Sequence, residues 1–231
     1  MFTLIPAFRY GWQQMQKHIW AFLAFTLLLT ASDIWGGLQL KAANIGEIMM
    51  MENVLELIPA QVMVWMGLLS LGIIVVNFFI VTLVLSFLRG IAPVTYLKTK
   101  IKHFPAYLGL MFLKYLAIAI GLTAFIVPGL FFLLALYFAE YLLIDKDMKI
   151  MASLKASWVL TKGFRAGIFF FEVNVFVITY LLSFPQSLWP DTVPTYAILA
   201  LLNVMWLPVV WNAAGHIYEF VSREHQKTDA Q

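Results

Sequence analysis

The sequence predicts an all-α integral membrane protein that crosses the bilayer six times and keeps both termini in the cytoplasm. Of its 231 residues, 62% are hydrophobic and only 12% are charged, whereas a soluble domain carries about 25% charged residues. The apolar residues also gather in runs of the length that a membrane helix needs, about 20 residues. The length allows one domain, so residues 1–231 are predicted to form a single transmembrane unit.

Six apolar segments are predicted to span the membrane. They lie at roughly 18–36, 61–88, 105–127, 129–144, 166–184 and 195–216. Basic residues precede the first segment, as in a signal peptide, but no clear A-x-A cleavage site follows it, which favours a retained span. The second segment is apolar back to Leu57, and Trp65 is expected at the outer membrane interface.

The third and fourth spans are predicted to form a helical hairpin. The stretch 106–144 has 39 residues, too many for one crossing and about right for two. The pair Pro128-Gly129 divides it and is predicted to be the turn, because proline cannot continue the helix before it and glycine accepts the backbone angles of a turn. Since lipid cannot satisfy the free amides of a turn, we expect this turn at the interface or covered by protein.

The distribution of charge supports this topology independently. Six spans place thirteen of the fifteen Lys and Arg residues on one side and one on the other, with Lys114 inside a span. The positive-inside rule makes the basic side cytoplasmic. The segments 37–56 and 185–194 are then periplasmic. Without a turn at Pro128, the two most basic loops, 89–104 and 145–165, would face opposite sides.

Two cytoplasmic segments are predicted to form amphipathic helices. Near the start of the chain, the apolar residues at helical spacing are Ile5, Phe8, Trp12 and Met15. In the segment 149–162, the residues that share one apolar face are Ile150, Met151, Leu154 and Trp158. Such helices lie along a membrane surface with their cations among the headgroups. Packing beneath the bundle as scaffold helices is the alternative, and the sequence leaves both open.

A recurring pattern covers the hairpin and the segment after it. It consists of PGL at 128–130, an apolar span, ASLKASW at 152–158 and TKG at 161–163. Over about residues 123–165 the chain resembles the YciC-like bacterial inner-membrane proteins, a family related to the membrane domain of some glycerophosphoryl diester phosphodiesterases. The resemblance implies a bundle of about six helices in a bacterial inner membrane. It implies no reaction, because the catalytic part of those phosphodiesterases is a separate soluble barrel.

Motifs that carry chemistry are absent from the sequence. It contains no glycine-rich phosphate loop, no H-E-x-x-H and no G-x-S-x-G. Cysteine is absent, and the four histidines lack the spacing of a metal site. No catalytic residue, metal or cofactor is therefore predicted. A nucleic-acid partner is not indicated, because the membrane topology already accounts for the lysines.

Polar residues within the spans are the candidates for an intramembrane site: Lys114, Glu140, Glu172 and Asn212. Lys114 precedes Pro128 by fourteen residues and Glu140 follows it by twelve, so their depths in an antiparallel hairpin match within ~3 Å. Charges at such depth face the protein interior and pair or hydrate. The two residues are predicted to approach each other as a structural ion pair. Snorkelling of Lys114 to the headgroups and a substrate or proton site are the alternatives.

The two basic loops supply a second candidate site, a rim that binds anionic headgroups. Its predicted members are Arg89, Lys98, Lys100, Lys102, Lys149, Lys155, Lys162 and Arg165. These observations favour a non-enzymatic inner-membrane protein that supports envelope or lipid homeostasis through lipids or a membrane protein partner. The alternative is a small transporter or permease subunit that uses Lys114, Glu140 and Glu172.

Overall fold

The computed structural model describes residues 4–42, 60–188 and 193–229, and these are helical apart from short connections. In chain order the helices are α1 (Leu4–Ala42), α4 (Ala60–Arg89), α5 (Pro93–Lys100), η1 (Ile101–His103), α6 (Phe104–Ala124), α7 (Ile126–Ala135), α8 (Ala139–Asp145), α9 (Ile150–Leu160), α10 (Arg165–Leu188) and α11 (Val193–Asp229). The all-α prediction is confirmed for these residues. Most of the predicted periplasmic loops, 37–56 and 185–194, lies outside them.

Five helical segments among the described residues are long and apolar enough to cross a membrane. They are Gly67–Arg89, Pro93–Ala124, Ile126–Asp145, Arg165–Phe184 and Ile198–Lys227. By the length and composition of its helices, the chain is a multi-pass membrane protein. The predicted first span, 18–36, is helical as part of α1, and the side chains of its last residues lie outside those described.

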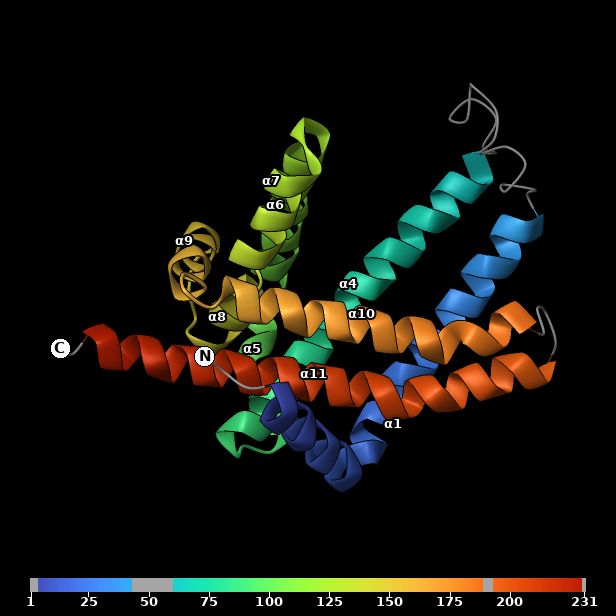
Figure 1. The fold of residues 1–231 in the computed structure, drawn as a ribbon, viewed down its shortest axis with the longest axis horizontal. Coiled ribbons are helices and arrows are strands. Elements are labelled where there is room, and N and C mark those ends of the chain that lie inside the picture. The colour runs from blue at the N-terminus through green and yellow to red at the C-terminus, as the bar shows by residue number, and fades with distance from the viewer. Residues whose placement is uncertain (1–3, 43–59, 189–192, 230–231) are drawn as a thin grey trace.

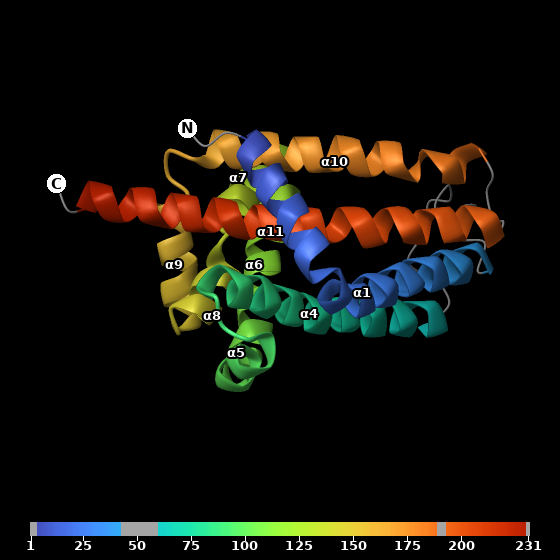
Figure 2. The ribbon, with the colours of Figure 1, turned by 90° about the horizontal axis from the view of Figure 1, so that it is seen from below.

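The helices associate in pairs that meet at one end of the molecule and diverge from it (Figure 1). The second part of α1 runs beside α4, α6 runs beside α7, and α10 runs beside α11. The α6–α7 hairpin projects away from α10 and α11, so that it lies behind α11 in the second view (Figure 2). The pairs meet around fully buried aromatic residues, Phe78, Tyr107, Phe138 and Tyr218.

The hairpin turn lies three residues before its predicted position. Phe125 is the extended residue between the two helices, with φ −165° and ψ 155°. Pro128 falls in the first turn of α7, where its missing N–H costs no helical hydrogen bond. Gly129 serves close packing, because a Cβ on it would lie 2.8 Å from the backbone nitrogen of Leu122 on α6. The prediction of a hairpin is confirmed, and the prediction of a turn at Pro128-Gly129 is wrong.

The predicted fourth span, 129–144, is two helices rather than one. Helix α7 ends at Ala135, and α8 begins at Ala139. At the break, the carbonyl oxygen of Ala135 accepts hydrogen bonds from the hydroxyls of Ser157 at 2.9 Å and Thr161 at 3.3 Å. The amide of Phe138 donates to the Ser157 hydroxyl at 3.2 Å. The side chains of α9 thus replace helical hydrogen bonds that the break removes.

Helix α9 packs through a face that the apolar pattern does not mark. Ser153, Ser157 and Leu160 are buried, whereas Met151 is 57% exposed and Trp158 is 39% exposed. Ser157 contacts the α7–α8 break, and α9 contacts α6 and α8. This geometry favours the scaffold alternative for 149–162 and leaves the predicted apolar face partly on the surface.

Helix α1 contains a kink at His18, whose backbone angles are non-helical. The first arm of α1 crosses α11 (Figure 2). Gly11 permits this crossing, because a Cβ there would clash with the backbone carbonyl of Val209. Met15 is buried, but Ile5 is 73% exposed, so the predicted apolar face of the first arm is divided between packing and surface.

Candidate functional site

A polar cluster forms inside the protein where α4, α6 and α8 meet. The Lys114 Nζ lies 3.7 Å from Glu140 Oε1, and both side chains are nearly buried, at 11% and 13% exposure. This confirms the predicted approach of the two residues. Glu140 Oε2 also accepts hydrogen bonds from Asn77 Nδ2 at 3.2 Å and Tyr107 Oη at 3.3 Å. Asn77 in turn donates to the Tyr107 hydroxyl at 2.9 Å.

A crevice of about 360 Å³ lies beside this cluster, where α1, α4, α6 and α11 diverge. Its walls are mainly apolar, and Asn77 and Tyr115 are polar residues among those that line it. Asn77 therefore joins the crevice to Glu140. This arrangement places a carboxylate one side chain away from a space between membrane helices.

The other two predicted intramembrane residues lie apart from this cluster. Glu172 on α10 accepts a hydrogen bond from the Tyr137 hydroxyl at 2.5 Å, next to the α7–α8 break. Asn212 on α11 donates from Nδ2 to the carbonyl oxygen of Pro208 at 2.8 Å. The Oδ1 atom of Asn212 is buried and has no hydrogen-bond partner among the described residues.

Some cations of the predicted rim are held by internal contacts. Arg89 binds the Asp145 carboxylate through both Nε and Nη2, with an Nε–Oδ1 distance of 2.8 Å. Tyr218 donates to the same carboxylate at 2.8 Å. These contacts connect the ends of α4 and α8 to α11, and the Asp145 side chain is only 5% exposed. Arg89 therefore acts as a structural clamp.

Lys100 and Arg165 are also engaged within the chain. Lys100 Nζ lies 2.8 Å from Asp147 Oδ1, and His103 Nε2 lies 2.7 Å from the same atom. The hydrogen bond from Lys100 lowers the pKa of the Asp147 carboxyl below its ordinary value. The Arg165 guanidinium stacks 4.4 Å from the centre of the Phe131 ring and donates to the Trp158 carbonyl oxygen at 3.0 Å.

The remaining rim cations are exposed lysines. They are Lys98, Lys102, Lys149, Lys155 and Lys162. In the part of the chain that the structure describes, no acidic side chain forms an ion pair with any of them. They belong to α5, η1, α9 and the residues flanking α9. Helices α5 and α9 both lie at the end of the molecule where the helix pairs meet (Figure 1).

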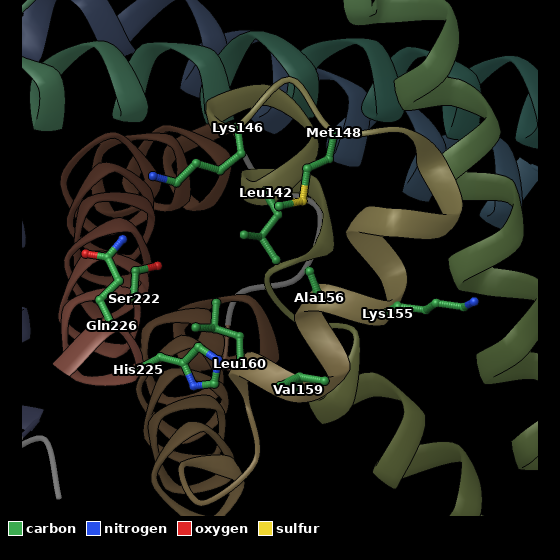
Figure 3. A pocket seen from close by; sticks show the side chains of 10 residues that line it. All are labelled: Leu142, Lys146, Met148, Lys155, Ala156, Val159, Leu160, Ser222, His225 and Gln226. Carbon is green, nitrogen blue, oxygen red and sulfur yellow. The ribbon is translucent and has the colours of Figure 1, made fainter. Parts of the chain in front are cut away.

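A cavity of about 420 Å³ opens at this same end, between α8, α9 and α11 (Figure 3). Its apolar lining is formed by Leu142, Met148, Ala156, Val159 and Leu160. Polar side chains stand around it: Lys146, Lys155, Ser222, His225 and Gln226. Figure 3 shows the Lys146 side chain directed toward the α11 side of the cavity, whereas the Lys155 side chain is directed away.

The histidines do not form a metal site in the described residues, where no three His, Cys, Asp or Glu side chains cluster. His18 stacks on Phe87 with ring centres 4.0 Å apart, and His216 packs 4.8 Å from the Tyr10 ring. These two contacts account for His18 and His216 as partners of aromatic rings.

Sequence reasoning missed the uncharged members of the polar clusters. Asn77, Tyr107 and Tyr137 each bind a carboxylate inside the helical region. Asn77 was open to detection, because it is an amide in the middle of the long apolar run 61–88, whose other amide, Gln61, is its first residue. The tyrosines were not, since tyrosine is common in membrane helices and near their interfaces.

Comparison of the chain with protein-family models, with curated proteins and with solved structures finds no match. The geometry of the described residues is therefore the basis for assigning a function.

Proposed function

We propose that the chain is a non-enzymatic protein of a bacterial inner membrane, with six spans and both termini in the cytoplasm, whose basic end binds anionic lipid in support of envelope or lipid homeostasis. The proposal includes the resemblance to the YciC-like proteins over residues 123–165. A membrane protein partner at the same end is compatible with it.

The observation that carries this proposal is the separation of the rim cations into two groups. Arg89, Lys100 and Arg165 are held by internal contacts. Five lysines remain exposed and without an ion pair in the described ranges: Lys98, Lys102, Lys149, Lys155 and Lys162. Unneutralised lysines near an anionic membrane surface each contribute about 1 kcal/mol of attraction, which salt screens.

The test is the lipid that remains with the purified protein. We expect the wild-type chain to be enriched in phosphatidylglycerol over phosphatidylethanolamine relative to the membrane from which it is extracted. A variant with all five lysines replaced by glutamine should lose this enrichment, and high salt during extraction should reduce it.

A matched pair of variants separates exposed from paired cations. Lys98→Gln with Lys102→Gln removes two exposed charges. Arg223→Gln with Lys227→Gln also removes two, but these cations are already paired with Glu219 and Glu224 at 2.6 Å. The first pair should reduce the enrichment more than the second. Equal enrichment in the wild-type chain and the five-lysine variant would contradict the proposal.

A transporter or permease subunit is the second candidate, and one observation favours it. Asn77 both lines the crevice and donates to Glu140, which is itself 3.7 Å from Lys114. A substrate or proton in the crevice would be one side chain from a charge pair. The pair of substitutions described in the Discussion tests this candidate, because a stable protein that has lost a cellular phenotype would favour it over a structural role.

A further inference from the structure

We infer that the cavity between α8, α9 and α11 is a binding site for one anionic phospholipid, with Lys146 as the residue that recognises its phosphate. This inference rests on the proposed function, which concerns general attraction of headgroups to the exposed lysines. It adds a defined site and a residue outside the predicted rim.

The composition of the cavity fits an amphiphile with an anionic head. Its volume of about 420 Å³ lies within the range of small-molecule pockets, about 300–1,000 Å³. Leu142, Met148, Val159 and Leu160 supply an apolar lining for the upper part of an acyl chain. A soluble anion such as inorganic phosphate would make no use of this lining, and a zwitterionic phospholipid would bring its own cation close to Lys146.

Lys146 is available for such a ligand because its contact with the protein is weak. Its Nζ lies 3.8 Å from Asp145 Oδ2, which is outside hydrogen-bond distance. Asp145 already accepts hydrogen bonds from Nε and Nη2 of Arg89 and from the Tyr218 hydroxyl. The Lys146 side chain is 40% exposed and is directed toward the α11 side of the cavity (Figure 3).

The side chains of α11 add polar groups on the same side. Ser222 and Gln226 lie one helical turn apart on α11, and both line the cavity. Figure 3 shows the Lys146 amine on the side of the cavity where Ser222 and Gln226 stand. A hydroxyl and an amide can donate hydrogen bonds to phosphate oxygens, which are strong acceptors.

Lys155 provides a matched control for the charge. It lines the same cavity and carries the same charge as Lys146, but its side chain is directed away from the interior (Figure 3). Lys146→Gln and Lys155→Gln therefore remove one positive charge each from the same end of the molecule. General attraction to an anionic surface would be reduced to a similar extent by either change, whereas a defined site distinguishes them.

The role of the cavity volume can be tested at Ala156, with Ala152 as the control position. The Ala156 side chain lines the cavity, and Ala152, one turn earlier on α9, is exposed. Ala156→Met should fill part of the cavity, and Ala152→Met makes the same change on the surface. Alanine and methionine both have high helix propensity, so neither substitution should unfold α9.

The experiment is native mass spectrometry of the full-length protein in detergent, titrated with dioleoyl phosphatidylglycerol and, separately, with dioleoyl phosphatidylcholine. We expect one phosphatidylglycerol to bind before the others. Lys146→Gln should weaken this first binding about fivefold, and Ala156→Met should remove it. Lys155→Gln should weaken it less than twofold, and Ala152→Met should leave it unchanged.

Two results would overturn the inference while leaving the proposed function in place. The first is a preference for phosphatidylglycerol that Lys146→Gln and Lys155→Gln reduce equally. The second is full competition by glycerophosphoglycerol, the deacylated headgroup, which has the same phosphodiester without acyl chains. If the five-lysine variant and the wild-type chain bind both lipids equally well, the proposed function itself fails.

Discussion

Glu140 and Asp145 lie on the same short helix, α8, and both are nearly buried, yet the protein holds them in different ways. At the end where the helix pairs meet, Asp145 accepts hydrogen bonds from Nε and Nη2 of Arg89 and from the Tyr218 hydroxyl. Glu140 is bound by two uncharged donors, Asn77 and Tyr107, and its cation Lys114 stays at 3.7 Å. A bidentate arginine fixes a carboxylate in one geometry. A lysine beyond hydrogen-bond distance leaves the carboxylate more freedom.

This difference assigns the two carboxylates different roles. Asp145 is a structural clamp that joins α4, α8 and α11. Glu140 is the better candidate for chemistry or transport, because it contacts Asn77 at the crevice. Measurements that compare the cost of disrupting the contacts of each carboxylate can sharpen or break this distinction.

The largest expected effect belongs to the Glu140–Lys114 pair. Glu140→Leu strands a lysine that is 11% exposed, and Lys114→Met strands a carboxylate that is 13% exposed. Each single change should cost about 3–5 kcal/mol in the free energy of unfolding, measured by SDS titration in detergent. The double variant should be far milder, because it leaves neither a lysine nor a carboxylate without its partner in the interior.

Additive losses in this double-mutant cycle would mean that the two side chains act independently. Each side chain would then extend toward the headgroups without stabilising the other. A double variant that folds well and has lost a cellular phenotype would support the transporter candidate.

An intermediate effect is expected at Asp145. Arg89→Gln removes a charged bidentate partner, but the Tyr218 hydroxyl still donates to the carboxylate. We expect a loss of about 2 kcal/mol, the size measured for hydrogen bonds to charged groups. Tyr218→Phe should cost about 1 kcal/mol in the same titration. If Arg89→Gln cost as much as Glu140→Leu, the contrast between a clamp that keeps a second donor and a cluster that is left with an unpaired lysine would be wrong.

The smallest effect is expected at a third carboxylate, Asp147, whose side chain is 53% exposed. Lys100 lowers the pKa of this carboxyl in the folded protein. A lowered folded pKa means that the pair stabilises the fold at neutral pH, and that this stabilisation is lost as the pH falls through the folded pKa. Asp147→Asn should cost under about 1 kcal/mol at pH 7 and nothing at low pH. A loss of equal size at both pH values would show that the effect is not electrostatic.

The sequence alone predicts the features that depend on helix length and depth. The matched distances of Lys114 and Glu140 from the hairpin turn predict their approach, because each residue of a helix adds a fixed rise. That argument survives the displacement of the turn to Phe125, since a shift of three residues changes the depths only by a few ångströms. The rotation of each helix about its axis is not encoded in this way, so Asn77 and Tyr107 could not be placed beside Glu140.

The break between α7 and α8 could not be predicted, because its cause is tertiary. No proline or glycine stands at 136–138, where the apolar run reads Leu136, Tyr137 and Phe138. The break exists because hydroxyls from α9 bind the freed backbone groups. Likewise, the apolar pattern of 149–162 could not reveal that α9 packs through its serines.

The break has a consequence for the order in which the chain assembles. Helix α7 has 10 residues and spans only about 15 Å, half of a hydrocarbon core. The groups that complete its end, Ser157 and Thr161, follow Ala135 by 22 and 26 residues. While the chain is being synthesised, the hairpin therefore enters the membrane before its own partners exist. Its final shape is fixed only when Ser157 and Thr161 have been synthesised, so the segment that contains α9 completes the hairpin structurally.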